Sequence, residues 1–496
     1  MNGPRKSDRL VVPEKPANKA GQPAAEAVEG RSLAGGNADQ QNVHWTQRQG
    51  STPSALDRVR EAARRNKGAK FTALLHHITV DRLRTAFEAL EPKAAAGVDG
   101  VTWGQYHEGV DEKLVDLHAR LHRGAYRAKP TRRAYIPKEG GKERALGIAA
   151  LEDKIVQRAV TEVMNAIYET DFLGFSYGFR PGRSQHDALD ALAAAVVRKR
   201  VNWVLDADIR GYFDAIDHGW LMKFVEHRIA DGRILRLIQK WLSAGVMEQG
   251  RWMESREGTP QGATVSPLLA NIYLHYVLDL WVQQWRKRST RGEVIIVRYA
   301  DDFIVGFQHR DDAEQFRLEL TARLRQFKLE LHPDKTRLIE FGRFAAQRRV
   351  EKGKTKPETF DFLGFTHICG HRRSGEFMLV RHTSQKRMRR RLHEIREEIY
   401  GRRHAPVHEQ GKWLGQVMRG YFQYHAVPTN SRALSVFRTQ IERHWLHALR
   451  RRGQRDRTTW RRMKSLSERW LPPVQILHPW PDGRFLDNTS GKSPVR

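Results

Sequence analysis

Residues 294–307 read VIIVRYADDFIVGF, in which two runs of apolar, strand-forming residues flank the adjacent carboxylates Asp301 and Asp302. Such runs predict a β-hairpin packed in the core, with the two acids at its tip. Neighbouring carboxylates repel each other and resist ionisation when they are unpaired, and a divalent cation removes that conflict. Mg²⁺ suits oxygen ligands and completes its shell with water and phosphate. The stretch therefore predicts a rigid hairpin that presents a metal site, to which a neighbouring strand should add a third acid.

The third acid is predicted to come from residues 204–218, which read VLDADIRGYFDAIDH. Asp206 and Asp208 lie two positions apart on a strand and share one face of it, so spacing alone leaves the ligand open. Two metal ions held by such a cluster can lower the pKa of an attacking hydroxyl and neutralise a leaving pyrophosphate, as in polymerases and nucleases. An isolated pair of aspartates is more often a loop or a helix cap. What favours the metal site is the order of four features: a basic hairpin, a strand acid, GTPQGATVSPLLANIYL and YADD.

The chain carries a strong positive charge, with 87 Lys and Arg against 57 Asp and Glu and a net charge of +30 over 496 residues. Such a field attracts polyanions, which makes nucleic acid the first partner to consider. Residues 381–464 alone hold 22 Lys and Arg against 6 Asp and Glu, with aromatic residues interleaved. Arginine-rich helices with aromatics suit a phosphate backbone and unstacked bases, although the aromatics fit a helical core equally well. The candidate contacts there are Arg389, Arg390, Arg419 and Tyr421.

Several classes of protein are disfavoured by the sequence. No run approaches the roughly 18 apolar residues that span a bilayer, so no membrane anchor is expected. Cys369 is the only cysteine, which excludes an intramolecular disulfide and a multi-cysteine zinc site. The charged, Pro/Gly-rich residues 1–55 lack the apolar segment of a secretory signal and are interpreted as a disordered basic tail. We therefore expect a soluble protein of a reducing cytoplasm.

The other patterns predict an α+β fold in which helices back an antiparallel sheet. RRAYIPKEGGKERALGI reads as a strand, a Gly-Gly turn and a second strand, which together form a basic hairpin. One helix is expected from 217 to about 245. A second is expected to start with Ser266 as N-cap and Pro267 at the first helical position. A third helix is expected over 311–328, after the hairpin that holds the two acids.

With these motifs in order, the sequence closely resembles the reverse transcriptase/maturase proteins encoded by bacterial group II introns, from about Phe71 to about Trp480. The resemblance implies a right-hand polymerase, with fingers, a palm with an antiparallel sheet, and an all-α thumb/maturase domain. In that family YADD carries the catalytic metals, so Asp301 and Asp302 are implied ligands of two Mg²⁺ ions. The family's strand acid heads the run that reads here as DIRGYFD, which selects Asp208 as the third ligand.

The resemblance also implies a nucleotide site. Phe213 matches the aromatic that lies under the nucleotide sugar and rejects a 2′-OH, and Gln261 in TPQG matches a residue that contacts the incoming dNTP. Lys138 and Arg144 match residues that bind the triphosphate. The compact ammonium of lysine and the planar guanidinium of arginine both suit contact with phosphate oxygens. The sequence departs from the family at two positions of this strand, since Ala145 and Ala149 stand where the family commonly has proline. Loss of that rigidity is expected to loosen the strand.

Other family blocks imply contacts with template and primer. Arg180 and Arg183, in FRPGRS, are the candidates for phosphate contact, and Lys335, in LHPDKT, is expected near the active site. WLGQVMRGYFQYH resembles the maturase segment, which binds the intron's own RNA and promotes splicing by stabilising the folded ribozyme. Residues after 465 show no His/Asn and cysteine-pair pattern of an endonuclease, so we expect a member without that domain.

The expected organisation is a tail (1–55), an N-terminal extension with fingers (56–200), a palm (201–370), a helical thumb/maturase region (381–470) and a C-terminal tail (471–496). The expected activity is Mg²⁺-dependent extension of a 3′-OH by dNTPs on an RNA template, with intron RNA and target DNA as partners. The setting would be a bacterial cytoplasmic ribonucleoprotein that reaches the nucleoid when it acts on DNA. Two alternatives stay open: an RNA-binding maturase whose polymerase is unused, and a defence- or CRISPR-associated reverse transcriptase.

Overall fold

The structure is a computed structural model that describes residues 17–18, 55–137, 143–255, 257–354, 356–453 and 458–484. Residues 1–54 lie outside these ranges apart from the short strand β1 (Ala17–Asn18), and so does the C-terminal segment 485–496. The predictions for the basic tail and for the last residues of the chain therefore fall largely outside the described part. None of the helices in the described ranges is long and apolar enough to cross a bilayer.

A four-stranded antiparallel sheet lies at the centre of the chain and confirms the predicted α+β class. Its strand order is β10-β5-β9-β8. The predicted hairpin is formed by β8 and β9, in which Tyr299 pairs with Asp302 across the tip. The sheet therefore joins segments that are far apart in the sequence, namely β5 (Trp203–Ala207), β8 (Val294–Tyr299), β9 (Asp302–Phe307) and β10 (Arg337–Glu340).

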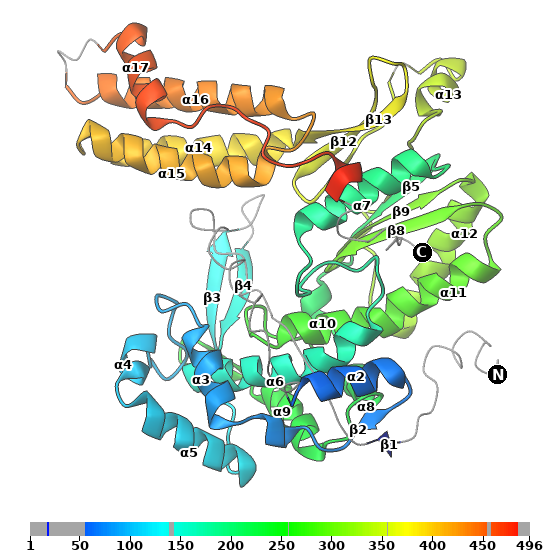
Figure 1. Cartoon of the computed structure of the whole chain (residues 1–496), viewed down its shortest axis with the longest axis vertical. Helices are drawn as coiled ribbons and strands as arrows, with labels where there is room; N and C mark the ends of the chain where they lie inside the picture. Colours follow the sequence, from blue (N-terminus) through cyan, green and yellow to red (C-terminus); the bar gives the residue numbers. More distant parts are fainter. Residues whose placement is uncertain are drawn as a thin grey trace.

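The central sheet has a layer of structure on each face (Figure 1), and alternate residues of its strands belong to two different cores. Leu205, Phe303 and Val305 belong to the larger core, which holds the long helical segment α10 (Ser266–Leu274), η4 (His275–Asp279) and α11 (Leu280–Arg288) together with α12 (Arg310–Gln326). Val204 and Ile304 face the opposite side, where they pack with α7 (Gln185–Arg198). Burial on both faces explains why the two runs of the hairpin are apolar throughout.

A second four-stranded sheet, of order β4-β3-β6-β7, contains the predicted basic hairpin. Strands β3 (Thr131–Pro137) and β4 (Glu143–Ile148) pair antiparallel, so Ala145 lies in a regular strand, opposite Tyr135, without the family's proline. The turn at 138–142 is outside the described residues. The other two strands are β6 (Val246–Glu248) and β7 (Arg251–Met253).

The N-terminal helices pack around the long helix α6 (Leu151–Asp171), which is buried along most of its length. The short strand β2 (Lys70–Phe71) pairs with β1 in parallel. The remaining elements of this part are α2 (Asp57–Arg65), η1 (Leu75–His77), α3 (Val80–Glu88), α4 (Trp103–His107) and α5 (Val110–His122).

Two details of the predicted helices are wrong. The expected helix 217–245 is divided into α8 (His218–Glu226) and α9 (Gly232–Ser243), because Asp231 caps the second helix and also accepts the amides of Leu74 and Leu75. Ser266 is the first residue of α10 rather than its N-cap, which is Val265. The Ser266 hydroxyl instead donates to the carbonyl of Pro260 at 3.0 Å and so fixes the preceding loop.

The C-terminal part begins with a small sheet of β11 (Phe360–Phe362), β12 (Phe365–His371) and β13 (Phe377–Thr383), so the predicted palm boundary at 370 falls inside β12. A helical bundle follows, with its own core around Trp445. Its last described residues return to α7, where Arg484 lies 3.3 Å from Asp190 (Figure 1). The bundle consists of α14 (Gln385–Gly401), α15 (Val407–His425), α16 (Ser431–Arg450) and α17 (Trp460–Trp470).

Candidate active site

The tip of the β8–β9 hairpin is a two-residue turn formed by Ala300 and Asp301, with Asp302 at the start of the returning strand. Ala300 has φ of +57°, a left-handed conformation that costs a residue with a Cβ atom of the order of 1 kcal/mol. Its carbonyl accepts a hydrogen bond of 2.9 Å from Nη1 of Arg298. The surrounding protein therefore holds this turn in a conformation that its sequence alone disfavours.

The strand register places one of the two earlier acids beside this tip. Ala207 pairs with Phe303, so Asp208, the next residue, reaches the position opposite Asp302. The backbone carbonyl of Asp208 accepts the amide of His332 at 2.8 Å, which fixes this end of the strand. Asp208 and Asp302 are thus brought to facing positions on one side of the central sheet.

Asp206 lies two residue pairs further from the tip, opposite Ile304. Its carboxylate is paired with Arg337 on the neighbouring strand β10, at 3.1 Å. Burial raises the pKa of Asp206, while the hydrogen bond from Arg337 opposes that shift. Asp208 is therefore the strand acid nearer the turn, and each of the two carboxylates is paired with a cation, Asp206 with Arg337 and Asp208 with Lys335.

Lys335 lies beside Asp208. In the register that pairs Arg337 with Asp206, Lys335 is the residue opposite Asp208, and its ammonium contacts that carboxylate. Three carboxylates form a donor set that suits Mg²⁺. Within the described ranges, however, no three His, Cys, Asp or Glu side chains lie close enough together to hold an ion. The donor types fit a magnesium site, whereas the Asp208 carboxylate contacts the ammonium of Lys335.

Phe213 lies in the short helix η3 (Tyr212–Asp214), which follows β5 after a short connection that contains Asp208. The TPQG loop is bound to it, because the amide of Thr259 donates to the Phe213 carbonyl at 2.8 Å. Gly258 lies so close that a Cβ atom there would meet this carbonyl oxygen at 3.0 Å. On its other side the loop accepts the amide of Gly147, in β4, through the Gln261 carbonyl at 2.8 Å. Two of the predicted nucleotide-site residues, Phe213 and Gln261, are therefore held on one connected backbone.

The two predicted triphosphate ligands are only partly described. Arg144 lies in β4, opposite Ile136, and only its backbone is described. Lys138 lies outside the described residues. Because β4 is joined to the TPQG loop through Gly147, the backbone of the predicted triphosphate strand is connected to the loop that carries Gln261.

Sequence reasoning missed Phe179, which lies between the turn and the predicted sugar site. Its φ is +57°, and its ring meets the Phe213 ring edge-on, with centroids 6.3 Å apart. The preceding Gly178 touches the hairpin tip so closely that a Cβ atom would lie 2.2 Å from the amide nitrogen of Ala300. Glycine in SYGFR is the sequence signal for this close approach of two backbones.

The predicted phosphate contact of Arg180 needs correction. Its side chain is 3% exposed and is paired with Glu169 at 2.8 Å, while Nη1 donates to the carbonyls of Leu173 and Ser176, each at 2.8 Å. Arg183 is also turned inward, donating to the Gly174 carbonyl at 2.6 Å, and burial lowers its pKa. Arg180 therefore shapes the loop over 174–183 instead of offering a charge to phosphate, whereas Arg183 is partly buried and is bonded to the same loop through Nη1.

The candidates in the C-terminal bundle divide into two groups. Arg389, Arg390 and Arg419 are exposed, as predicted for side chains that meet nucleic acid, although Arg390 is also paired with Glu394 at 2.8 Å. Tyr421 is buried and stacks on Phe437 with ring centroids 3.6 Å apart. The prediction for Tyr421 is thus corrected, because its ring belongs to the bundle core.

Comparison with known proteins defines the class of this chain. Residues 136–367 match the family model for reverse transcriptase (RNA-dependent DNA polymerase). Protein YkfC of Escherichia coli strain K12 is 36% identical over 323 residues, which cover 59% of this chain and 81% of YkfC. The chain therefore belongs to the reverse transcriptase family and carries an RNA-dependent DNA polymerase domain. Membership implies dNTP substrates, a divalent metal ion, and a nucleic-acid template and primer.

The relatives include one protein encoded by a group II intron and one found in the cob intron. The group II intron-encoded protein LtrA of Lactococcus lactis subsp. cremoris is 36% identical over 242 residues, which cover 48% of this chain and 40% of LtrA. A 91 kDa protein in the cob intron of Schizosaccharomyces pombe is 28% identical over 333 residues, or 64% of this chain and 41% of that protein. The chain thus spans less than half of each of these intron proteins.

Proposed function

We propose that this protein is a group II intron-encoded reverse transcriptase that extends a 3′-OH primer with dNTPs on an RNA template. Asp208, Asp301 and Asp302 are its metal ligands. The observation that carries the proposal is the facing of Asp208 and Asp302 beside the Ala300–Asp301 turn, at the end of a sheet in a chain of the reverse transcriptase family. In this assignment the central sheet is the palm, the β3–β4 hairpin belongs to the fingers, and the C-terminal bundle is the thumb.

Each predicted residue has a distinct task in this reaction. When bound, two Mg²⁺ ions would lower the pKa of the primer hydroxyl and neutralise the departing pyrophosphate. Asp208, whose carboxylate contacts Lys335, would be one of the three residues that hold the metal ions. Lys138 and Arg144 bind the triphosphate, Gln261 contacts the nucleotide, and the ring of Phe213 fills the space that a 2′-OH would need.

A second task, binding of the intron's RNA, is assigned to the C-terminal bundle. Its support is the charge of residues 381–464 and the exposure of Arg389, Arg390 and Arg419. The names of two similar proteins place them in introns, in agreement with this task. Binding that favours the folded ribozyme would promote splicing and, with reverse transcription, mobility.

Primer extension tests the proposal, with Asp301→Ala as the inactive variant. Wild-type protein should extend a DNA primer on an RNA template with dNTPs, whereas Asp301→Ala should not. Asp311→Ala is the matched control, because Asp311 is an exposed acid in α12, paired with Arg291. If the wild-type protein is no more active than Asp301→Ala, the polymerase assignment is wrong, and an RNA-binding protein without polymerase activity is favoured. If Asp301→Ala still promotes splicing of the intron that encodes the chain, the two tasks are separate.

A further inference from the structure

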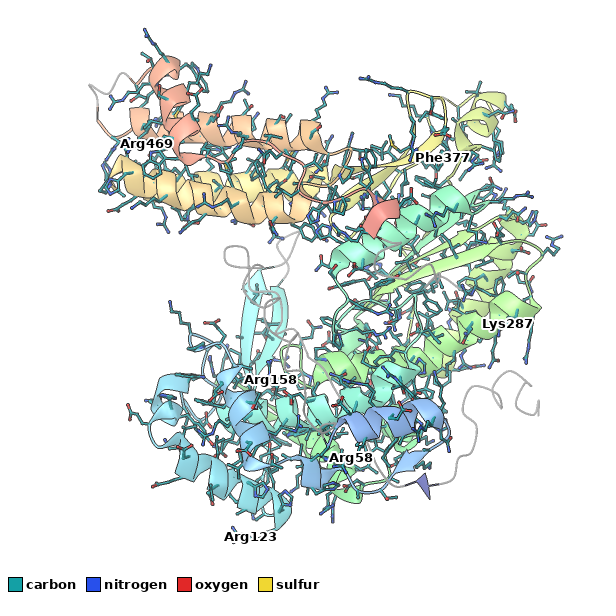
Figure 2. The ribbon with its side chains drawn as sticks, viewed as in Figure 1. Arg58, Arg123, Arg158, Lys287, Phe377 and Arg469 are labelled. Carbon is teal, nitrogen blue, oxygen red and sulfur yellow. The ribbon has the colours of Figure 1, made fainter. Side chains whose placement is uncertain are left out.

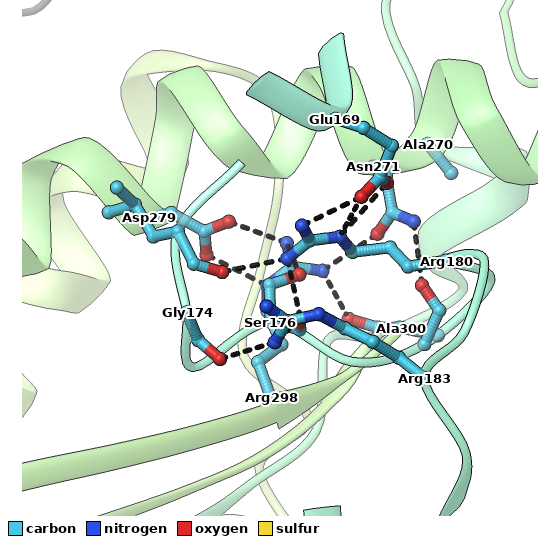
Figure 3. A network of polar contacts seen from close by, with 12 residues as sticks. Glu169, Gly174, Ser176, Arg180, Arg183, Ala270, Asn271, Asp279, Arg298 and Ala300 are labelled. Atoms are coloured by element: carbon cyan, nitrogen blue, oxygen red, sulfur yellow. Dashed lines mark hydrogen bonds and ion pairs between the residues drawn. The ribbon is translucent and has the colours of Figure 1, made fainter. Parts of the chain in front are cut away.

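The side chain of Arg298 is fully buried directly beneath the Ala300–Asp301 turn (Figure 3). Its Nε and Nη2 donate to the two carboxylate oxygens of Asp279 at 2.8 and 2.6 Å. Nη2 also donates to the hydroxyl of Ser176 at 2.7 Å, and Nη1 donates to the Asn271 side chain at 3.1 Å. The remaining partner is the Ala300 carbonyl, at 2.9 Å. One guanidinium thus joins the loop at Ser176 and the helical segment that carries Asn271 and Asp279 to the turn.

The π-helix η4 accounts for the position of Asp279. In a regular α-helix the residue that aligns with Asn271 two turns later lies about seven positions on. A π-turn accommodates one extra residue, which moves the aligned position to Asp279 at the end of η4. The wider turn therefore lets Asn271 and Asp279, from one continuous helical segment, reach the same guanidinium. π-turns of this kind are frequent at functional sites.

Burial makes this pair sensitive to removal of either partner. Arg298 and Asp279 are both 0% exposed, and burial raises the pKa of Asp279 against the opposing charge of Arg298. Removing one member of such a pair leaves an uncompensated buried charge, whereas replacing both members by apolar residues is often tolerated. Burying this ion pair therefore costs desolvation energy, and its arginine contacts the turn that carries Asp301.

We propose that Arg298 is a positioning residue, which holds the Ala300–Asp301 turn in its left-handed conformation so that Asp301 and Asp302 keep a fixed place beside Asp208. This inference rests on the proposed function of those three acids. Arginine suits the task because its planar group offers five donors in a fixed fork. A lysine ammonium offers three donors from one point and cannot serve Asp279, Ser176, Asn271 and Ala300 together.

Arg298→Lys tests the proposal, because it keeps a positive charge beside Asp279 but removes the planar guanidinium with its five hydrogen-bond donors. A misplacement of about 1 Å in a catalytic group costs about 100-fold in rate. We expect kcat for primer extension to fall about 100-fold, with the Kd for template-primer unchanged. Mn²⁺ binding to the free protein, followed by electron paramagnetic resonance, should weaken as well. If Arg298→Lys fails to fold, the double variant Arg298→Met/Asp279→Leu replaces it in the test. This variant removes both buried charges and should show the same loss of kcat.

Arg228→Lys is the matched control. Arg228 is also fully buried, is paired with Asp171 at 2.8 Å, and donates to backbone carbonyls of 63–69, but it does not contact the turn. We expect it to lower the melting temperature without the loss of kcat. Equal kcat in the Arg298 and Arg228 variants would overturn the positioning role, and so would loss of the fold in both Arg298 variants while Arg228→Lys folds. Full activity of Asp301→Ala would instead refute the proposed function, so the two failures are distinguishable.

Discussion

Asp208 and Asp302 face each other at the ends of the antiparallel strands β5 and β9, although they are more than ninety residues apart in the sequence. Two residue pairs further along the same strands, Asp206 faces Ile304 and is paired with Arg337. The two strand acids share a face and a residue type, so their different neighbours give them different expected roles.

Substitution of these two acids should separate a metal ligand from a structural acid. We expect Asp208→Asn to lower kcat for primer extension about 1000-fold, because removal of one charged group from a preorganised site costs about 100- to 1000-fold. Asp206→Asn should cost less than about tenfold, since a pair with a half-exposed arginine is worth at most about 1 kcal/mol. Steady-state kinetics with equal folded fractions, checked by circular dichroism, measure the difference. The opposite ranking would make Asp206 the ligand.

A smaller residue at 213 should relax the choice between deoxyribonucleotides and ribonucleotides. The backbone of Phe213 is fixed by Thr259 and its ring by Phe179, so the ring cannot move away to admit a 2′-OH without disturbing both contacts. We expect Phe213→Val to lower the ratio of kcat/KM for dNTP over rNTP at least about tenfold, since lost steric exclusion leaves weak discrimination. Phe213→Tyr keeps the bulk and serves as control. An unchanged ratio in Phe213→Val would assign the ring to packing alone.

The sequence predicted those features whose signal is local. The β8–β9 hairpin follows from two apolar runs around YADD, and the helix α12 follows from its periodicity. The pairing of Asp208 with the turn required the family resemblance, because alternation alone allows Asp206 equally well. Burial of arginine was not predictable from its type, since arginine in a Gly/Pro-rich loop is normally exposed. Arg180 and Arg298 are buried because other elements, α6 and η4, supply Glu169 and Asp279 as partners.

The π-helix and the corrected role of Tyr421 show the same limit. A continuous apolar helical pattern predicts helix but does not reveal the extra residue in η4, since the widened turn is stabilised by tertiary partners such as Arg298. Likewise, an aromatic at helical spacing fits either a bundle core or a nucleic-acid face. Only the contact of Tyr421 with Phe437, which comes from another helix, decides between them.

The exposed arginines of the C-terminal bundle should govern the salt dependence of RNA binding. The logarithm of the RNA binding constant falls linearly with the logarithm of the salt concentration, and each phosphate contact makes this slope steeper by about 0.7 to 0.9. The triple variant Arg389→Ala/Arg390→Ala/Arg419→Ala should therefore bind RNA more weakly and flatten the slope by about 2. Filter binding of a structured intron RNA over a range of KCl concentrations measures both quantities.

Two controls accompany that experiment. Arg123 is exposed at the end of α5, far from the bundle that carries Arg469, as Figure 2 shows, so Arg123→Ala should leave the slope unchanged. Tyr421→Phe keeps the buried ring and should also leave RNA affinity unchanged. A triple variant with wild-type affinity and slope would move the RNA surface away from these three arginines.

Acid should destabilise the small sheet of β11, β12 and β13 through a buried histidine. His367 is fully buried, stacks on Phe360 with centroids 4.8 Å apart, and lies near Arg381. Burial lowers its pKa from 6.5 to about 3, with Arg381 acting in the same direction. Between these two pH values the unfolded chain binds a proton that the folded chain does not bind. The free energy of unfolding should therefore be fully retained above pH 6.5 and fall as the pH is lowered toward 3.

His367→Phe tests this pH dependence, because a phenyl ring keeps the stacking on Phe360 and removes the proton. Between pH 6 and 4 the variant should show a smaller decline in the free energy of unfolding, by up to about 1.4 kcal/mol per pH unit, the value for one proton. Urea unfolding at several pH values gives the slope. His393→Gln, at an exposed position of α14, is the control and should keep the wild-type slope. An identical slope in His367→Phe would mean that His367 already titrates in the folded protein much as it does in the unfolded chain.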